Sequence, residues 1–328
     1  MKDGKKIIWI IDGEWTDHKI EEETFIKKGY ELKVTHPDDL EKDLPLYAPY
    51  ADGIAIQISF DCNEAFLNHL ESCKVICVYG VGFNNINLEA AGRKEIAVYN
   101  VPDYCVDEVS DHTIALLFSV GRRLKSYNLK VEQGKWDALD TLPIYRFKDM
   151  TIGLLGFGRI ARSVAIKMKA TGANIIAHDK YADENAFKNL GVVPVSFEEL
   201  LAQSNMLSLH VPLTKETENL LDYDCMMKMQ KGAMIVNTCR GGIINEEDLA
   251  LLIELGHISG AGIDVFTEEP IPADHPLLNK AEVIITPHSS YVSVSSFHEL
   301  KTRVCQIIEN GINGIPQPNM VNKQYVNQ

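Results

Sequence analysis

A glycine-containing turn follows the apolar run Thr151–Leu155. It reads Gly156-x-Gly158-x-x-Ala161, and residues with a helical pattern come after it. Gly156 permits a tight turn, Gly158 lets the backbone approach a pyrophosphate, and Ala161 lets the helix pack close to the strand. The phosphates would then lie at the free N–H groups of the helix N-terminus. The turn predicts a dinucleotide site, although a motif this short needs support from its context.

A carboxylate stands where the ribose of a dinucleotide needs an acceptor. A second apolar run, Asn174–Ala177, leads to Asp179, which comes 21 residues after Gly158. Dinucleotide sites place an acidic residue about 20 residues after the turn. Asp179 would accept from both hydroxyls of an unphosphorylated ribose and would repel a 2′-phosphate. The alternative is a turn residue after a strand, but together with the glycine turn Asp179 predicts NAD as the cofactor.

Further motifs follow in a fixed order along the chain. They are Leu209–Thr214 (LHVPLT), Val236–Gly242 (VNTCRGG), Gly262–Pro270 (GIDVFTEEP) and Thr286–His288 (TPH). With the glycine turn, their order and spacing resemble those of the D-isomer-specific 2-hydroxyacid dehydrogenases over nearly the whole chain. The segments Val101–Val109 and Pro287–Tyr291 are most similar to a branch near the C-terminal-binding-protein-like and phosphoglycerate-dehydrogenase-like members.

The resemblance implies the architecture. It is an α/β fold with two Rossmann-like, doubly wound domains and mostly parallel sheets. An NAD-binding domain, residues 103–292, is inserted into a substrate-binding domain made of residues 1–102 and 293–328. The resemblance also implies an active site in the cleft between the domains and a homodimer formed largely by the NAD-binding domains.

The same resemblance assigns the residues that would bind NAD. Asp264 would contact the nicotinamide carboxamide, beside a wall formed by Thr238 and Cys239. Cys239 stands where Ala or Ser is commoner in the family. The full predicted set is Gly156, Gly158, Arg159, Ile160, Asp179, His210, Val211, Pro212, Thr217, Thr238, Cys239, Asp264 and His288.

Reduction of a 2-oxo acid needs a carboxylate anchor, a polarised carbonyl and a proton for the developing alkoxide. Arg240 suits the first two needs, because its planar fork of donors can hold carboxylate and carbonyl together; taken alone, it could equally form a structural ion pair. His288 suits the third, since it follows a strand and a Pro at the open end of a sheet. Glu269 would orient His288 and favour its charged form. Glu268 competes for this role, and the family pattern selects Glu269, directly before Pro270.

The segment Val78–Asn85 resembles the family's substrate loop. Its glycines would let the N–H groups of Val81 and Gly82 point at the substrate carboxylate. Together with Arg240 and His288 they form the predicted substrate-binding set. The alternative is an ordinary turn at the end of a strand.

The first domain is poor in cations near this loop. Between residues 43 and 92, Lys74 is the only Lys or Arg, and Gln57 and Val78 align with arginines of the phosphoglycerate-type relatives. A phosphate buried without cationic donors is costly. The sequence therefore predicts a small neutral or apolar 2-oxo acid rather than phosphohydroxypyruvate. The alternative is that Arg122, Arg123 or Arg146 reaches the cleft and supplies the cation.

The elements that must position these residues are short apolar runs alternating with amphipathic segments, a pattern typical of parallel sheets with helices on both faces. The predicted strands are Ile7–Ile11, Leu32–Thr35, Gly53–Ile58, Val75–Tyr79, Thr151–Leu155, Asn174–Ala177, Met206–His210, Met234–Asn237, Gly260–Ile263 and Val283–Thr286. The predicted helices are Glu21–Lys28, Asn63–Leu70, Val106–Lys125, Ile160–Ala170, Asn245–Leu255 and Phe297–Asn310. The extended segment Tyr99–Pro102 marks a domain boundary.

Composition narrows the class of protein. The 328 residues are 45% hydrophobic and 24% charged, which suits about two globular domains. A net charge of −14 disfavours nucleic acid and anionic membranes as partners, and no apolar run approaches the roughly 18 residues of a membrane span. Seven cysteines without a CxxC pair or zinc spacing predict free thiols, a cytoplasmic location and no metal site.

Together these features predict an NAD-dependent oxidoreductase that interconverts a 2-oxo acid and a (2R)-2-hydroxy acid by hydride transfer. The alternative is a dinucleotide-sensing, corepressor-like scaffold that binds a protein partner, as relatives in the nearby branch do. The intact set of Arg240, Glu269 and His288 argues against a scaffold, which has no need of proton transfer. An NAD-binding hydrolase of related architecture would still need hydride chemistry at the nicotinamide.

Overall fold

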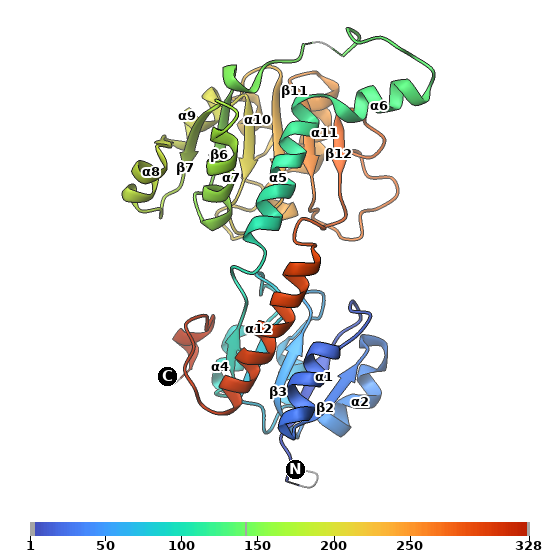
Figure 1. Cartoon of the computed structure of the whole chain (residues 1–328), viewed down its shortest axis with the longest axis vertical. Coiled ribbons are helices and arrows are strands. Elements are labelled where there is room, and N and C mark those ends of the chain that lie inside the picture. Colours follow the sequence, from blue (N-terminus) through green and yellow to red (C-terminus); the bar gives the residue numbers. More distant parts are fainter. Residues whose placement is uncertain (1–3, 142, 327–328) are drawn as a thin grey trace. The chain divides into compact units, whose positions relative to one another are not determined.

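The chain divides into two compact units in the computed structural model, which describes residues 4–141 and 143–326. The first unit consists of residues 1–104 and 293–328, and the second of residues 105–292 (Figure 1). Both units are built on parallel sheets, so the predicted α/β class is confirmed. Within the described residues, none of the helices is long and apolar enough to span a membrane.

A five-stranded sheet with the order β2-β1-β3-β4-β5 forms the first unit. Its strands are β1 (Ile7–Ile11), β2 (Glu31–Thr35), β3 (Ala51–Ile56), β4 (Val75–Val78) and β5 (Ala97–Tyr99). One face is covered by α2 (Leu40–Tyr47), α3 (Glu64–Asn68) and α4 (Leu88–Arg93). The other is covered by α1 (Lys19–Phe25) and α12 (Val294–Ile312) (Figure 1). Strand β1 is therefore buried along its whole length.

The last helix returns to the first unit, which the sequence alone left open. Helix α12 lies so close to the sheet that a Cβ at Gly53 would come within 2.8 Å of Ile308. A Cβ at Gly311 would likewise lie 2.6 Å from Val75. Two glycines thus permit the close approach, and both termini build one unit.

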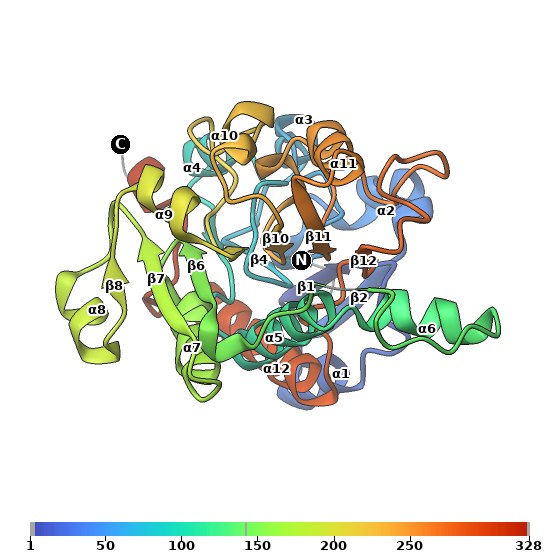
Figure 2. The same ribbon diagram turned by 90° about the horizontal axis from the view of Figure 1, so that it is seen from above.

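A seven-stranded sheet with the order β12-β11-β10-β9-β6-β7-β8 forms the second unit. Its strands are β6 (Thr151–Leu155), β7 (Asn174–His178), β8 (Val193–Pro194), β9 (Met206–Leu209), β10 (Ala233–Asn237), β11 (Ile258–Ile263) and β12 (Val283–Ile285). Helices α5 (Val106–Gly121), α7 (Arg159–Lys169) and α8 (Glu184–Leu190) pack on one face. Helices α9 (Phe197–Gln203), α10 (Tyr223–Met227) and α11 (Glu246–Glu254) pack on the other (Figure 2).

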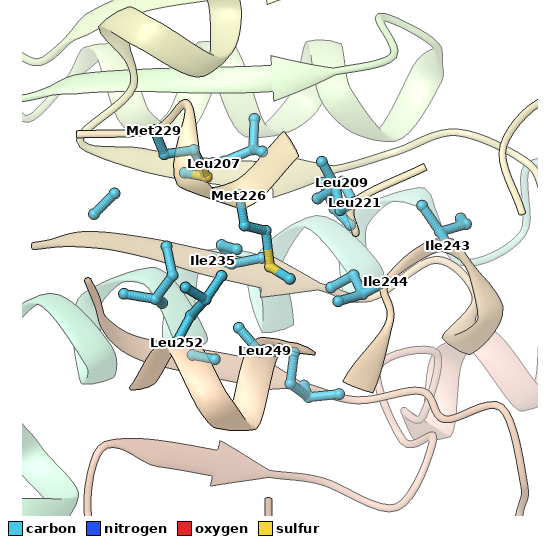
Figure 3. Close-up of a cluster of buried hydrophobic side chains, with 14 of the residues drawn as sticks. Leu207, Leu209, Leu221, Met226, Met229, Ile235, Ile243, Ile244, Leu249 and Leu252 are labelled. Carbon is cyan, nitrogen blue, oxygen red and sulfur yellow. The ribbon is translucent and has the colours of Figure 1, made fainter. Parts of the chain in front are cut away.

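One apolar cluster anchors the loop that follows β10. Figure 3 shows side chains of β9, β10, α10 and α11 meeting between sheet and helices, among them Leu207, Leu209, Ile235, Met226, Leu249 and Leu252. Ile243 and Ile244, which come just after Arg240, belong to this cluster and are almost fully buried. Burying such a side chain contributes about 1.5–3 kcal/mol. The turn that carries Arg240 is therefore fixed on its C-terminal side.

The structure differs from the sequence prediction at two predicted helices and at two short strands. The predicted helix 106–125 is two helices, because α5 ends at Gly121 and α6 (Leu124–Glu132) begins after Arg123, whose φ is +57°. The guanidinium of Arg123, the residue at the break between the two helices, donates to the backbone carbonyl of Ser259. The predicted helix 21–28 is α1 followed by a short 3-10 turn, Ile26–Lys28. Strands β5 and β8 were missed because three and two residues are too few to show a period.

Candidate active site

The three predicted catalytic residues follow three neighbouring strands of the second sheet. Arg240 comes after β10, Glu269 after β11 and His288 after β12. The strands are parallel, so their carboxyl ends share one edge of the sheet. Ligands of α/β proteins bind at this edge.

His288 and Glu269 form a hydrogen-bonded pair. The Nδ1 atom of His288 lies 2.7 Å from Oε2 of Glu269, and Oε1 accepts from the Phe266 N–H at 2.8 Å. Partial burial raises the pKa of Glu269, but the bonds from His288 and Phe266 outweigh burial and hold that pKa below its ordinary value. Glu269 is therefore ionised at neutral pH. Glu268 is exposed and makes no hydrogen bond or ion pair with any described residue.

The backbone of His288 adopts a left-handed conformation, with φ of +50°. Its N–H donates to the carbonyl oxygens of Asp264 at 2.8 Å and Thr286 at 3.1 Å. Residues other than glycine rarely adopt this conformation, and it is found at functional sites where the surroundings hold it in place. Because Nδ1 faces Glu269, Nε2 is the ring nitrogen left for a substrate, and 35% of the side chain is exposed.

The carboxylate of Asp264 holds the loop that carries His288. Asp264 is fully buried. Its Oδ1 accepts from the Ser289 N–H at 2.9 Å and from the Thr286 hydroxyl at 2.5 Å, and its Oδ2 accepts from the Ser290 N–H at 3.0 Å. The family resemblance assigned this side chain to the nicotinamide carboxamide. Its side-chain hydrogen bonds go to the loop after β12, and Nε2 of His112 on α5 lies 3.7 Å from its Oδ1. The carboxylate therefore shapes the loop, and its contact with the nicotinamide carboxamide stays a prediction.

The Thr286 hydroxyl extends this contact to helix α5. Nε2 of His112 lies 3.0 Å from the Thr286 oxygen, which in turn donates to Asp264. The sequence analysis gave His112 and Thr286 no role of their own. A single His on an amphipathic helix carried no signal, because most histidines at such positions are ordinary core or surface residues.

Asn237 closes the turn that carries Arg240. This side chain is 1% exposed. It donates from Nδ2 to the Arg240 carbonyl at 2.7 Å and accepts the Cys239 N–H on Oδ1 at 3.0 Å. Within the described residues, Arg240 makes one side-chain bond, from Nη1 to the Cys239 carbonyl, and has no carboxylate partner. The alternative that Arg240 belongs to a structural ion pair gains no support.

Thr238 and Cys239 are fixed by neighbours on either side. The Thr238 hydroxyl lies 2.8 Å from that of Thr113 on α5. The Cys239 thiol lies 3.0 Å from Oδ1 of Asn237, and burial raises its pKa to about 11. Cys239 is therefore a neutral thiol at physiological pH and does not add a charge to the site. In the described part of the chain, no three His, Cys, Asp or Glu side chains gather closely enough to hold a metal ion.

The glycine turn has the shape that a pyrophosphate requires. Gly156 has φ of +91°, and a Cβ there would lie 2.5 Å from the His210 carbonyl oxygen. Gly158 is different, since no described atom lies within 4 Å of a Cβ built on it. The fold itself does not require glycine at position 158, so its missing side chain leaves room for a ligand.

Helix α7 begins directly after Gly158 with Arg159 and Ile160, and no side chain caps it. The four helices that follow it in the second unit are each capped, by Asp183, Ser196, Asp222 and Asn245. The first N–H groups of α7 are thus left for an anion at the positive end of the helix dipole. Ala161, fully buried, packs the helix onto the sheet.

Asp179 is tied to the glycine turn by backbone bonds. Its Oδ2 accepts from the Phe157 N–H at 2.7 Å, and its Oδ1 accepts from Tyr181 at 2.8 Å and Ala182 at 3.1 Å. A carboxylate has about four acceptor positions, so about one remains on Oδ2. Three backbone donors thus share the carboxylate, and its binding of the ribose hydroxyls stays a prediction. Lys180 turns away to Glu216, at 3.5 Å.

Four of the predicted NAD-binding residues, His210, Val211, Pro212 and Thr217, follow β9. Nε2 of His210 lies 2.9 Å from the Ser208 hydroxyl, and burial lowers the pKa of His210 to about 3, so the ring is neutral. Val211 packs beside the glycine turn, with Cγ1 3.0 Å from a Cβ at Gly156. The Thr217 hydroxyl donates to the Pro212 carbonyl at 2.6 Å. Thr217 thus closes its own turn.

Val81 and Gly82 lie in the first unit, after β4. The turn begins at Gly80, with φ of +159°, and the Val81 carbonyl accepts from Nδ2 of Asn100 at 2.6 Å. The N–H groups of Val81 and Gly82 have no partner among the described residues. Asn100 holds the turn from its far side and leaves these two donors unused.

Comparisons with known proteins agree with this geometry. Residues 114–290 match the family described as "D-isomer specific 2-hydroxyacid dehydrogenase, NAD binding domain". The chain is 35% identical over 260 residues to a glyoxylate reductase of Korarchaeum cryptofilum, covering 77% of each chain. It is 31% identical over 299 residues to a D-3-phosphoglycerate dehydrogenase of Archaeoglobus fulgidus, covering 90% of this chain and 56% of that relative.

Solved structures give the same result. A D-lactate dehydrogenase of Aquifex aeolicus, complexed with NAD and lactic acid, superimposes with a TM-score of 0.85 at 27% identity, covering 94% of this chain and 96% of that one. A glyoxylate reductase of Paecilomyes thermophila gives a TM-score of 0.88 at 26% identity, covering 98% and 99%.

The chain belongs to the D-isomer-specific 2-hydroxyacid dehydrogenase family. It is an NAD-dependent oxidoreductase that interconverts a 2-oxo acid and a 2-hydroxy acid. The relatives named above are all enzymes, so the corepressor-like alternative gains no support. The chain spans only about half the length of the phosphoglycerate dehydrogenase it matches.

We expect a strong preference for NADH over NADPH, because the Asp179 carboxylate repels a 2′-phosphate and Lys180 is turned toward Glu216. The kcat/KM with NADH should exceed that with NADPH by about a hundredfold or more, which corresponds to a difference in activation free energy of roughly 2.7 kcal/mol. The Lys180→Ala variant should leave the ratio unchanged. Equal kcat/KM values would mean that Asp179 does not face the ribose.

Proposed function

We propose that Arg240, Glu269 and His288 carry out the interconversion of a 2-oxo acid and a (2R)-2-hydroxy acid. NADH, when bound, supplies the hydride that reduces the carbonyl carbon. Arg240 binds the substrate carboxylate and polarises the carbonyl oxygen with its remaining donors. His288 gives a proton from Nε2 to the new alkoxide in reduction and removes it in oxidation. Glu269 orients the ring and stabilises its protonated form.

The observation that carries this proposal is the His288–Glu269 bond of 2.7 Å at the same sheet edge as Arg240, which lacks a carboxylate partner in the described chain. A hydrogen-bonded His–Glu pair and an Arg with unused donors supply the three functions that the chemistry needs. The second unit would hold NAD at the glycine turn. The first unit would bind the substrate carboxylate through the free N–H groups of Val81 and Gly82.

His288→Ala should lower kcat by about 10²–10⁴, the usual contribution of a general acid, because no other group would supply the proton. NADH binding, followed by its fluorescence, should be kept. His298→Ala removes an exposed histidine of α12 and serves as the matched control. If His288→Ala retained activity within a few-fold of the unmodified enzyme, the assignment of the proton donor would be wrong.

The surroundings of the substrate loop favour an uncharged substrate tail. At the carboxyl edge of the first sheet, Gln57 is 3% exposed and donates to Oδ1 of Asp12 at 2.9 Å. Val78 is fully buried. These two positions, where phosphoglycerate-type relatives carry arginines, offer no cation. Arg93, further along the chain, is already paired with Glu64 and Glu89.

We therefore expect glyoxylate, hydroxypyruvate or an aliphatic 2-oxo acid to be a better substrate than phosphohydroxypyruvate. NADH oxidation with each acid measures kcat/KM. A preference for the phosphorylated acid of about tenfold or more, roughly 1.4 kcal/mol, would contradict this interpretation of the first unit.

We also propose that the enzyme is a homodimer whose contact surface is α6 with the segment after it. Large apolar side chains are exposed there, with Trp136 at 90%, Leu139 at 72% and Tyr145 at 58%. A groove beside them is lined by Leu124, Tyr127, Val131 and Ile284, among others. Exposed apolar surface of this kind is typical of interfaces. Light scattering should give twice the chain mass, and Trp136→Ser should shift it toward the monomer; a monomeric unmodified enzyme would contradict the proposal.

A cytoplasmic location is the last part of the proposal. All seven cysteines are free thiols. Burial raises the pKa of the Cys73 and Cys305 thiols to about 12, and it also raises the pKa of the Cys62 and Cys77 thiols. Free thiols are typical of reducing compartments. Cell fractionation tests this location, and recovery outside the cytoplasm would contradict it.

A further inference from the structure

A second carboxylate–histidine pair lies beside the predicted catalytic one. Glu246, the first residue of α11, places Oε2 2.8 Å from Nε2 of His275. Its Oε1 accepts both the N–H of Thr267 at 2.8 Å and the Thr267 hydroxyl at 2.9 Å. The side chains of Glu246 and His275 are 12% and 11% exposed. One nearly buried carboxylate therefore binds both ends of the segment 267–275, and Glu269 lies within that segment.

The ring of His275 is itself held in one orientation. Its Nδ1 accepts from the Leu277 N–H at 3.3 Å, so the proton toward Glu246 is on Nε2. The ring packs edge-on against Phe266, with 5.3 Å between ring centres. The Phe266 N–H is the group that binds Oε1 of Glu269. The second pair thus contacts the loop on both sides of Glu269.

This loop also packs against the turn that carries Arg240. A Cβ built at Gly241 would lie 1.9 Å from the backbone carbon of Phe266 and 2.3 Å from the nitrogen of Thr267. Only glycine allows this approach. Fixing Phe266 and Thr267 therefore also fixes the spacing between the Arg240 turn and the Glu269 segment.

Helix α11 does not need Glu246 for its own stability. Asn245 caps the helix by accepting from the Asp248 N–H at 3.1 Å. Glu247 and Asp248 also place negative charge in the first turn, where it stabilises a helix. Glu247 is exposed, and its side chain makes no hydrogen bond or ion pair in the described part of the molecule. The carboxylate of Glu246 is left for the loop.

We propose that Glu246 is a positioning residue for the reaction, acting through Glu269. This inference rests on the proposed roles of Glu269 and His288. The Glu269 side chain is 37% exposed and, among the described residues, bonds only to His288 and to Phe266. Its position against His288 therefore depends on where its segment is held. A displacement of about 1 Å in such a group can cost about a hundredfold in rate.

Glu246→Ala should lower kcat by about 10–100-fold on the best 2-oxo acid of the panel, with KM and NADH binding changed less than about threefold. Glu246→Gln should recover part of the loss, because its amide oxygen can still accept from Thr267. Glu247→Ala removes the same charge from the same helix turn and is the matched control, with unchanged kcat. An unchanged kcat in Glu246→Ala would overturn the proposal.

A double-mutant cycle separates positioning from a merely structural role. In the Glu269→Ala background, adding Glu246→Ala should lower kcat by less than about twofold further. Glu246 acts through the Glu269 carboxylate, which this background lacks. If the kcat loss of the double variant equals the product of the two single losses, the proposal is overturned, while the role of Glu269 is kept. Full activity of Glu269→Ala alone would instead overturn the proposed role of Glu269, and this inference with it.

Hydrogen exchange supplies a readout that does not depend on activity. The Thr267 amide should exchange at least about tenfold faster in Glu246→Ala than in Glu247→Ala, because its acceptor is gone. If Glu246→Ala fails to fold, the Thr267→Val variant replaces it, because this variant removes only the bond from the Thr267 hydroxyl to Glu246. Thr267→Val should lower kcat several-fold and leave KM unchanged. No change in kcat for a folded Thr267→Val would then overturn the proposal.

Discussion

Both sheets are covered by helices on both faces, and this constraint decides where chemistry can occur. A parallel strand buried on two sides holds mostly apolar residues, as in β1 and in residues 233–236 of β10. Most of the polar side chains that could do chemistry therefore lie at the carboxyl ends of the strands. The residues that bind, polarise and transfer protons therefore come from loops, and the problem for the fold is to make those loops rigid.

The second unit solves that problem with buried polar side chains that bind backbone. Asn237 closes the Arg240 turn, Asp264 closes the His288 loop, and Glu246 holds the Glu269 segment. A buried carboxylate or amide is costly unless its hydrogen bonds are made. Each of these side chains therefore admits few loop conformations. The left-handed backbone of His288 is one result, since two carbonyl oxygens accept its N–H.

The sequence predicted most strands of both sheets, because a strand that is buried on both faces carries an uninterrupted apolar run of four to six residues. It also assigned roles to the glycine turn, Asp179 and the set of Arg240, Glu269 and His288, since chemistry restricts the residue types at those positions, and these roles stay predictions. It did not reveal His112, Glu246 or His275. Their partners are backbone atoms and hydroxyl groups, which any sequence offers, so only the folded chain shows which donors they meet. The break at Arg123 was missed for a similar reason, as its carbonyl partner at Ser259 is far away in sequence.

The three backbone bonds of Asp179 link the selection of a cofactor to the shape of its binding loop. The carboxylate that we expect to exclude a phosphorylated ribose also accepts the N–H of Phe157, between the two glycines of the turn. A smaller neutral residue at position 179 would remove both the repulsion of a 2′-phosphate and the hydrogen bond to the Phe157 N–H. The binding loop would then accept NADP but would be held less rigidly. Relaxed cofactor choice along this lineage therefore requires at least two coordinated substitutions, one to admit the phosphate and one to restore the anchor of the turn.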